Sequence, residues 1–141
     1  MRKLIKAASI SIILWGGSAV AQVHAQDILV YLTSGSTQTQ GMAMVLSGQM
    51  VKKKAKVHIL LCDDAGDLSL TNTKYKKLKP LDKSPNKLLD DLILQGVTVE
   101  VCALYLPNKT GMAVLKDGIE TAKPEIIAEM LLNPRFKIFS F

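Results

Sequence analysis

Runs of consecutive apolar residues constrain the fold of this chain more than any other feature. Two such runs cover residues 27–33 and 57–62, and a third stretch at 97–102 is rich in valine. Strands buried on both faces of a sheet are continuously apolar, whereas strands with one solvated face alternate apolar and polar residues. These runs therefore predict the central strands of a parallel sheet, which needs crossover helices on both faces.

Helical patterns lie between the expected strands. Apolar residues recur at helical spacing over residues 42–50, and the lysines at 52–54 suit the negative end of a helix dipole. Ser84 and Pro85 predict the start of a second helix that ends at Gly96. The other expected elements are a loop (68–83), a short helix (108–115), a brief strand or turn (118–120), a last helix (124–132) and a closing strand (136–141). This alternation predicts one three-layer α/β domain around a mostly parallel sheet.

The N-terminus has the pattern of a secretory signal peptide over residues 1–25. A basic start precedes an apolar run at 7–15, and small residues then offer cleavage sites, of which we favour Ala25 over Ala21. The apolar run is shorter than the ~20 residues that span a bilayer, so a stable membrane anchor is the weaker interpretation. We therefore expect a single mature domain over residues 26–141, located in the periplasm or secreted.

Removal of this leader changes the charge and the redox setting of the chain. The whole sequence has a formal net charge of +6, and loss of Arg2, Lys3 and Lys6 leaves +3. Such a modest excess in an exported protein argues against a nucleic-acid partner. An oxidising compartment also allows the two cysteines of the sequence to pair.

The candidate chemistry centres on Cys62 and Cys102, which end the second and third expected strands. Sites in open parallel sheets form beyond the carboxyl ends of the strands. A thiol there has a lowered pKa when a helix N-terminus or a cation lies near, and it is then a good nucleophile. Lys109 and the helix expected after Pro107 would supply that positive field to Cys102.

Two other interpretations of the cysteines stay open. Both fit small buried hydrophobic residues. If their strands are neighbours, about 4.8 Å apart, a structural or redox-active disulfide between Cys62 and Cys102 also fits. The sequence has no Cys-x-x-Cys spacing, which excludes a thioredoxin-type motif.

The third expected strand and its surroundings resemble a known family. Residues 92–102 (LILQGVTVEVC), followed by ALYLPN at 103–108, place a cysteine after a Gly-Val-x-Val-x-Val strand. Residues 116–119 and 137–141 add to the likeness. On these stretches the chain resembles the DsrE/DsrF-like sulfur-relay proteins over nearly all of its mature length.

This resemblance implies a three-layer α/β/α fold with five parallel strands, assembled as a homo-oligomer. It also implies that Cys102, which matches the reactive position of the family, carries sulfur as a persulfide and passes it to a partner protein. Cys62 has no counterpart in the family pattern. Two features depart from that pattern: characterised members are cytoplasmic, and NKTG at 108–111 stands where Arg-Gly often follows the cysteine.

Other candidate sites in the sequence are weak. His58 lies in mid-strand among apolar residues, which favours a core histidine over a ligand. The acidic run at 63–67 lacks the rest of a calcium loop, and no His/Cys/carboxylate cluster has zinc spacing. The turn at 34–37 lacks the Gly-Lys-Ser/Thr ending of a P-loop. We therefore expect neither a metal nor a nucleotide cofactor.

The sequence thus supports one leading hypothesis and two alternatives. The leading hypothesis is an exported DsrE-like sulfur carrier or sulfurtransferase with Cys102 as its catalytic thiol, Cys62 as a second candidate thiol, and a sulfur donor or acceptor protein as its partner. The first alternative is a binding or assembly module of the same fold without chemistry. The second is a thiol redox protein that uses Cys62 and Cys102 as a reversible pair.

Overall fold

The structure is a computed structural model that describes residues 25–141. The expected signal peptide falls on residues 1–24, which lie outside the described part of the chain. Among the described residues, no helix has the length and apolar character needed to cross a membrane.

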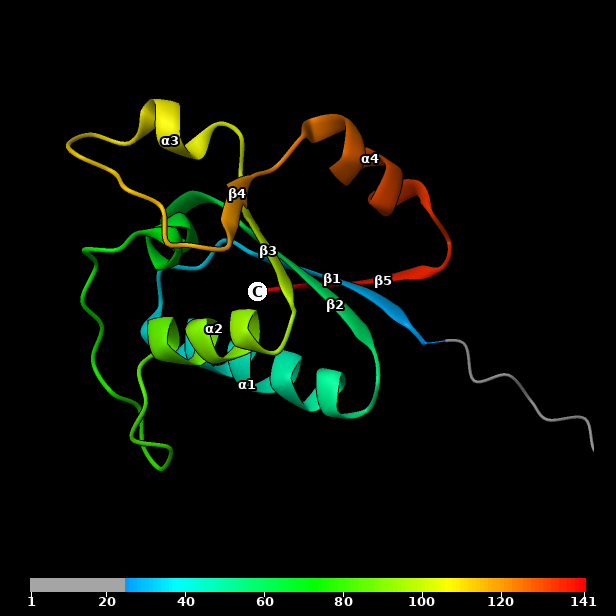
Figure 1. Cartoon of the computed structure of the whole chain (residues 1–141), viewed down its shortest axis with the longest axis horizontal. Helices are drawn as coiled ribbons and strands as arrows, with labels where there is room; N and C mark the ends of the chain where they lie inside the picture. Colours follow the sequence, from blue (N-terminus) through cyan, green and yellow to red (C-terminus); the bar gives the residue numbers. More distant parts are fainter. Residues whose placement is uncertain (1–24) are drawn as a thin grey trace, which may run out of the picture.

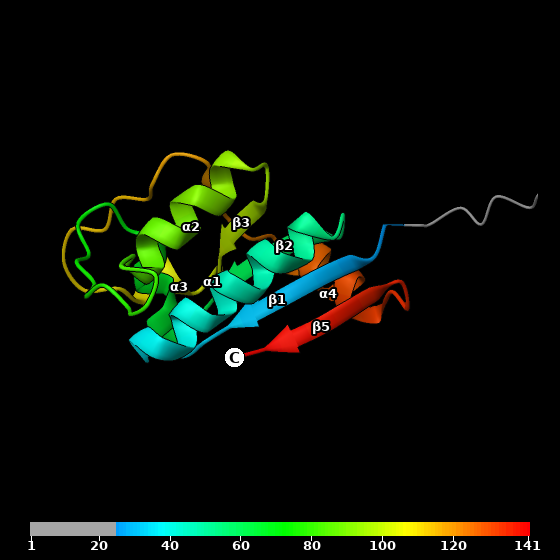
Figure 2. The ribbon, with the colours of Figure 1, turned by 90° about the horizontal axis from the view of Figure 1, so that it is seen from below.

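Five strands form one sheet at the centre of the molecule (Figures 1 and 2). They are β1 (Asp27–Leu32), β2 (Lys56–Leu61), β3 (Thr98–Val101), β4 (Ile119–Thr121) and β5 (Phe136–Ser140). Their order across the sheet is β4-β3-β2-β1-β5, and every neighbouring pair is parallel. The predicted three-layer α/β/α fold around a five-stranded parallel sheet is therefore confirmed.

Helices cover both faces of this sheet (Figure 1). Helices α1 (Thr37–Lys52) and α2 (Pro85–Leu94) lie together on one face, and α4 (Pro124–Leu132) lies on the other. Two shorter helices, η1 (Asp63–Ser69) and α3 (Tyr105–Asn108), follow β2 and β3. From β1 to β4 the chain crosses the sheet in one direction, and it then returns to the far side of β1. Because such crossovers are right-handed, this reversal places α4 on the opposite face.

The two faces of the sheet are buried unequally. The face under α1 and α2 carries the larger hydrophobic core, in which Leu32, Ile59 and Val101 are completely buried. The α4 face has a smaller buried cluster, made of Leu29, Leu60, Cys62, Ala122 and Ile127. One short helix cannot cover five strands, so part of the second face stays open, and Tyr31 and Ile138 remain exposed there.

Most expected boundaries agree with the structure. Helix α2 begins at Pro85 directly after Ser84, and Gly96 follows its end with a positive φ of 84°, a conformation that glycine adopts at no steric cost. Helix α1 begins earlier than its apolar pattern, at Thr37, because the Ser36 side chain caps it by accepting a hydrogen bond from the Thr39 amide.

The prediction of a short helix over residues 108–115 is wrong. Helix α3 ends at Asn108, where the prediction began, and the Asn108 side chain donates a hydrogen bond of 2.8 Å to the carbonyl of Leu104. Gly111 has a φ of +87°, which a right-handed helix cannot contain. The segment instead runs back across η1, where Leu115 forms a bridge with Leu70.

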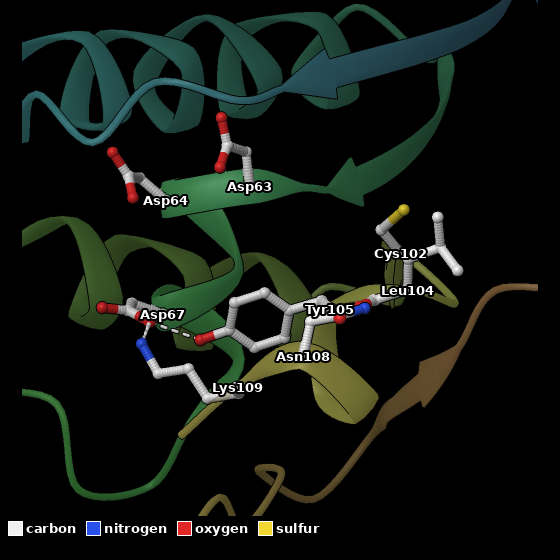
Figure 3. A pocket seen from close by; sticks show the side chains of 8 residues that line it. All are labelled: Asp63, Asp64, Asp67, Cys102, Leu104, Tyr105, Asn108 and Lys109. Atoms are coloured by element: carbon white, nitrogen blue, oxygen red, sulfur yellow. Dashed lines mark hydrogen bonds and ion pairs between the residues drawn. The ribbon is translucent and has the colours of Figure 1, made fainter. Parts of the chain in front are cut away.

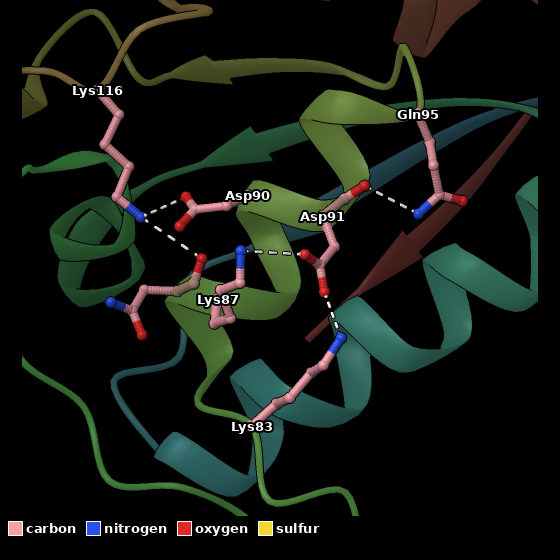
Figure 4. A network of polar contacts seen from close by, with 7 residues as sticks. Lys83, Lys87, Asp90, Asp91, Gln95 and Lys116 are labelled. Atoms are coloured by element: carbon pink, nitrogen blue, oxygen red, sulfur yellow. Dashed lines mark hydrogen bonds and ion pairs between the residues drawn. The ribbon is translucent and has the colours of Figure 1, made fainter.

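Ion pairs on the outer side of α2 tie it to neighbouring loops (Figure 4). The Lys116 ammonium lies 2.8 Å from a carboxylate oxygen of Asp90, which connects α2 to the segment before β4. Asp91 receives Lys83 at 2.6 Å and Lys87 at 3.3 Å. The two pairs of Asp91 are open to solvent and each contributes little to stability, whereas the Lys116 side chain is only 14% exposed.

A close side-chain contact joins β2 and β3 on the α4 face. His58 Nε2 lies 2.7 Å from Glu100 Oε2, and the two side chains are 13% and 17% exposed. Both atoms are sealed from solvent, and neither has another hydrogen-bond partner in the described part of the chain. Each group therefore depends on the other to offset the cost of its burial.

Loss of one member of this pair should destabilise the fold. Glu100→Leu leaves the His58 ring without its partner, and we expect the free energy of unfolding to fall by about 1–3 kcal/mol in urea titrations. The double variant H58L/E100L replaces both groups by apolar side chains and should recover most of that loss. Equal losses in the single and double variants would contradict the mutual dependence of the two residues.

Candidate functional site

Cys62 and Cys102 lie side by side at the carboxyl edge of the sheet. The parallel register pairs Leu61 of β2 with Val101 of β3, so the next residue on each strand is a cysteine. The Cys102 amide donates a hydrogen bond of 2.8 Å to the carbonyl of Leu61, and the Cys62 amide donates one of 2.9 Å to Leu32. Both cysteines are thus held by the hydrogen bonds that extend the sheet, and their strands are neighbours.

The two thiols are free but differ in environment. Cys62 is 5% exposed, whereas Cys102 is half-buried. Burial, together with the hydrogen bond and charge of Cys102, raises the pKa of the Cys62 thiol to about 12, and a hydrogen bond with Tyr31 acts in the opposite direction. Cys62 is therefore a protonated thiol and a poor nucleophile at neutral pH.

Tyr31 of β1 is a third titratable group in this cluster. The neighbouring charge of Cys62 raises the pKa of its hydroxyl, and burial and a hydrogen bond with Cys62 act in the same direction. Tyr31 was not among the candidates from the sequence. The alternation of side chains along β1 could have pointed to Tyr31, because it places Tyr31 on the same face of the sheet as Leu29.

A cavity of about 360 Å³ opens on one side of Cys102 (Figure 3). We call it the acidic cavity, and its lining is Asp63, Asp64, Asp67, Cys102, Leu104, Tyr105, Asn108 and Lys109. The aspartates come from η1, after β2, and the tyrosine and asparagine come from α3, after β3. The acidic run at 63–67 thus forms one wall beside the candidate thiol.

Lys109 makes its ion pair with Asp67. The Tyr105 hydroxyl donates to the same carboxylate oxygen, and the Lys109 ammonium lies 5.5 Å from the centre of the Tyr105 ring. Burial favours a raised pKa for Asp67, but the hydrogen bonds from Lys109 and Tyr105 outweigh it and hold that pKa below its ordinary value. The carboxylate is thus ionised at neutral pH and fixes both partners.

The structure brings Lys109 into the cavity of Cys102 but on its opposite side, with Tyr105 between them (Figure 3). Its influence on the pKa of the Cys102 thiol stays a prediction. The helix expected after Pro107 does not form, since Pro107 lies inside the four-residue α3, so that source of positive field is absent.

A second cavity, of about 430 Å³, opens on the other side of Cys102, between the sheet and α4. We call it the apolar cavity. Its lining is Leu29, Tyr31, Leu60, Cys62, Cys102, Ala103, Leu104, Ala122, Pro124, Ile127, Ala128 and Leu131. Cys102 and Leu104 line both cavities, so the Cys102 thiol lies where a polar wall and an apolar wall meet.

Comparison with known proteins supports the architecture. The YchN protein from E. coli has a similar structure, with a TM-score of 0.68 over 84% of this chain and 100% of that chain, at 16% sequence identity. The fold is DsrE-like. No family model matches the chain, and no curated protein matches it. The resemblance drawn from the sequence is thus supported for the fold.

Within residues 25–141, no group of three His, Cys, Asp or Glu residues is arranged to hold a metal ion.

The difference between the two thiols predicts selective alkylation. Native protein treated with iodoacetamide at pH 8 should gain one adduct, on Cys102, because Cys62 is buried and its pKa is about 12. Peptide mass spectrometry locates the adduct, and treatment in urea, which should modify both cysteines, is the control. Equal modification of Cys62 in the native protein would contradict this environment.

Gly66 positions the Tyr105 ring in the acidic cavity. A Cβ atom at Gly66 would overlap that ring, so Gly66→Ala should displace Tyr105 and lower the free energy of unfolding by about 1–3 kcal/mol. Gly48→Ala is the matched control, since its Cβ would meet only Leu92, at an ordinary 3.7 Å. Because Gly48 lies in the interior of α1, Gly48→Ala should raise the free energy of unfolding by about 0.5–1 kcal/mol. Equal effects in urea denaturation would contradict the contact with Tyr105.

Proposed function

We propose that this chain is an exported sulfur carrier in which Cys102 holds sulfur as a persulfide, with a donor or acceptor protein as its partner and a homo-oligomeric assembly. The observation that carries the proposal is the position of Cys102. Its half-buried thiol lies at the carboxyl edge of the sheet, opens on two cavities and lies beside a second, protonated thiol. The DsrE-like fold also supports it.

Loading of Cys102 moves one sulfur atom without net oxidation. The Cys102 thiolate attacks the terminal sulfur of a donor persulfide, R–S–SH. The S–S bond of the donor breaks, a new S–S bond forms as Cys102–S–SH, and R–S⁻ leaves. Unloading is the same reaction with the roles changed: an acceptor thiolate attacks the terminal sulfur, and the Cys102 thiolate leaves.

Cys62 controls how long a persulfide on Cys102 survives. A Cys62 thiolate that attacks the inner sulfur of Cys102–S–SH would expel HS⁻ and leave a Cys62–Cys102 disulfide. Because the pKa of Cys62 is about 12, almost none of it is thiolate at neutral pH, and this discharge is slow. The sulfur then remains on Cys102 until an acceptor arrives.

A second candidate function, a thiol redox protein, is favoured by the neighbouring positions of Cys62 and Cys102. In that reaction a disulfide of a partner accepts two electrons and two protons and is reduced to two thiols. The two cysteines of this chain are oxidised to a bridge. The raised pKa of Cys62 makes it a poor attacking thiol for this reaction at neutral pH.

Mass spectrometry after incubation with a low-molecular-weight organic persulfide, R–S–SH, tests the proposal. The wild-type protein should gain about 32 Da, the mass of one sulfur atom, on the peptide that contains Cys102. Cys102→Ser should abolish the adduct. Cys62→Ser should keep it and prolong its lifetime, most clearly as the pH rises and Cys62 of the wild type begins to ionise.

Two outcomes would overturn sulfur relay. A loss of two hydrogens that links the Cys62 and Cys102 peptides, with no sulfur adduct at any time, would favour the redox function. No modification of either thiol in the native protein, with both reactive in urea, would favour a module of this fold without chemistry.

A further inference from the structure

We propose that the apolar cavity binds the sulfur donor, and that this donor is an organic persulfide of low molecular weight that has an uncharged, apolar organic group R and reacts in its protonated form, R–S–SH. The inference rests on the proposed function and names its substrate class. The organic group R lies in the cavity, and the terminal sulfur faces Cys102.

The apolar cavity has the size and walls of a small-molecule site. Its volume of about 430 Å³ falls within the range of ligand pockets. Leu29 and Leu60 of the sheet form its buried floor, and Ile127 and Leu131 of α4 form the opposite wall. None of its lining residues is charged. Its polar side chains are the hydroxyl of Tyr31 and the two thiols, which is the pattern of an apolar pocket with a few convergent polar groups.

Charge disfavours anionic donors on both sides of Cys102. In the acidic cavity, the positive charge of Lys109 is paired with Asp67, and Asp63 and Asp64 make no ion pair within residues 25–141. A polysulfide dianion would meet like charges there. In the apolar cavity it would lose its hydration with no cation to compensate. A donor with an uncharged, apolar R group that enters the cavity as protonated R–S–SH avoids both costs.

The same cavity accommodates the leaving group. When Cys102 takes the terminal sulfur, the electron pair of the broken S–S bond goes to R–S⁻, which still lies among the apolar walls. Tyr31 and Cys62 line this cavity, and both have pKa values above their ordinary ones, so both remain protonated and can donate hydrogen bonds to that thiolate. It takes a proton from water as it departs, and Cys102 keeps the sulfur.

Binding is tested without sulfur transfer by using an unreactive thioether. Dibutyl sulfide added to the reduced protein should shift the NMR amide signals of residues that line the apolar cavity, and the dianion 3,3′-thiodipropionate should not. Leu131→Asp places a charge in the wall of the cavity and should weaken dibutyl sulfide binding about tenfold. Leu132→Asp is the matched control, because Leu132 is the next residue of α4 but lines neither cavity.

These two leucines suit the comparison because both are accessible, at 50% for Leu131 and 84% for Leu132, so the variants should fold. Ala128→Leu, which fills the cavity from its exposed rim, is a second variant that should weaken binding. Absence of any thioether binding to the folded wild-type protein, or equal binding to L131D and L132D, would overturn the inference.

Loading rates then separate this inference from the proposed function. Benzyl persulfide should place sulfur on Cys102 about tenfold faster than the charged glutathione persulfide, and L131D should remove that advantage. If neither donor loads Cys102 while dibutyl sulfide still binds, the proposed function fails and the binding site stands. If both donors load wild type and L131D at equal rates, the substrate class is wrong and the carrier function stands.

Discussion

The hydrogen-bonded register between β2 and β3 determines the geometry of the whole candidate site. Leu61 lies opposite Val101, and the backbone of Cys102 continues that ladder by bonding to Leu61. Because side chains alternate between the faces of a sheet, this register turns both thiols toward α4. A slip of one residue would send one of them into the core under α1 and α2. The positions of the thiols are thus set by a buried sheet and not by a loop.

The two faces of the sheet are covered unequally, and the larger hydrophobic core and the candidate site lie on opposite faces. Helices α1 and α2 close one face over the larger core, whereas α4 alone covers the other. The space beside α4 is the apolar cavity, and the short helices η1 and α3 line the acidic cavity at the same edge of the sheet. Cys102 lies between them because its strand ends where both cavities begin.

The parallel sheet and the two cysteines were predictable from local patterns. Apolar runs marked β1 and β2, and a cysteine directly after each of β2 and β3 placed both thiols at one edge. The pairing of Lys109 with Asp67 was not predictable, since the two residues meet only because β2 and β3 are neighbours. The misplaced helix after Pro107 has a similar cause: the positive φ of Gly111 belongs to a segment shaped by its contact with η1, which local propensity does not reveal.

The pairing of β1 with β5 has a consequence for how the molecule assembles. The first strand of the domain lies between β2 and the last strand (Figure 2). The amide of Thr33 donates a hydrogen bond to the carbonyl of Phe141. One edge of β1 therefore has no partner until residues 136–141 have been synthesised. During translation that open edge is exposed to pairing with other chains, and the slowest contacts to form are those that join the two ends of the domain.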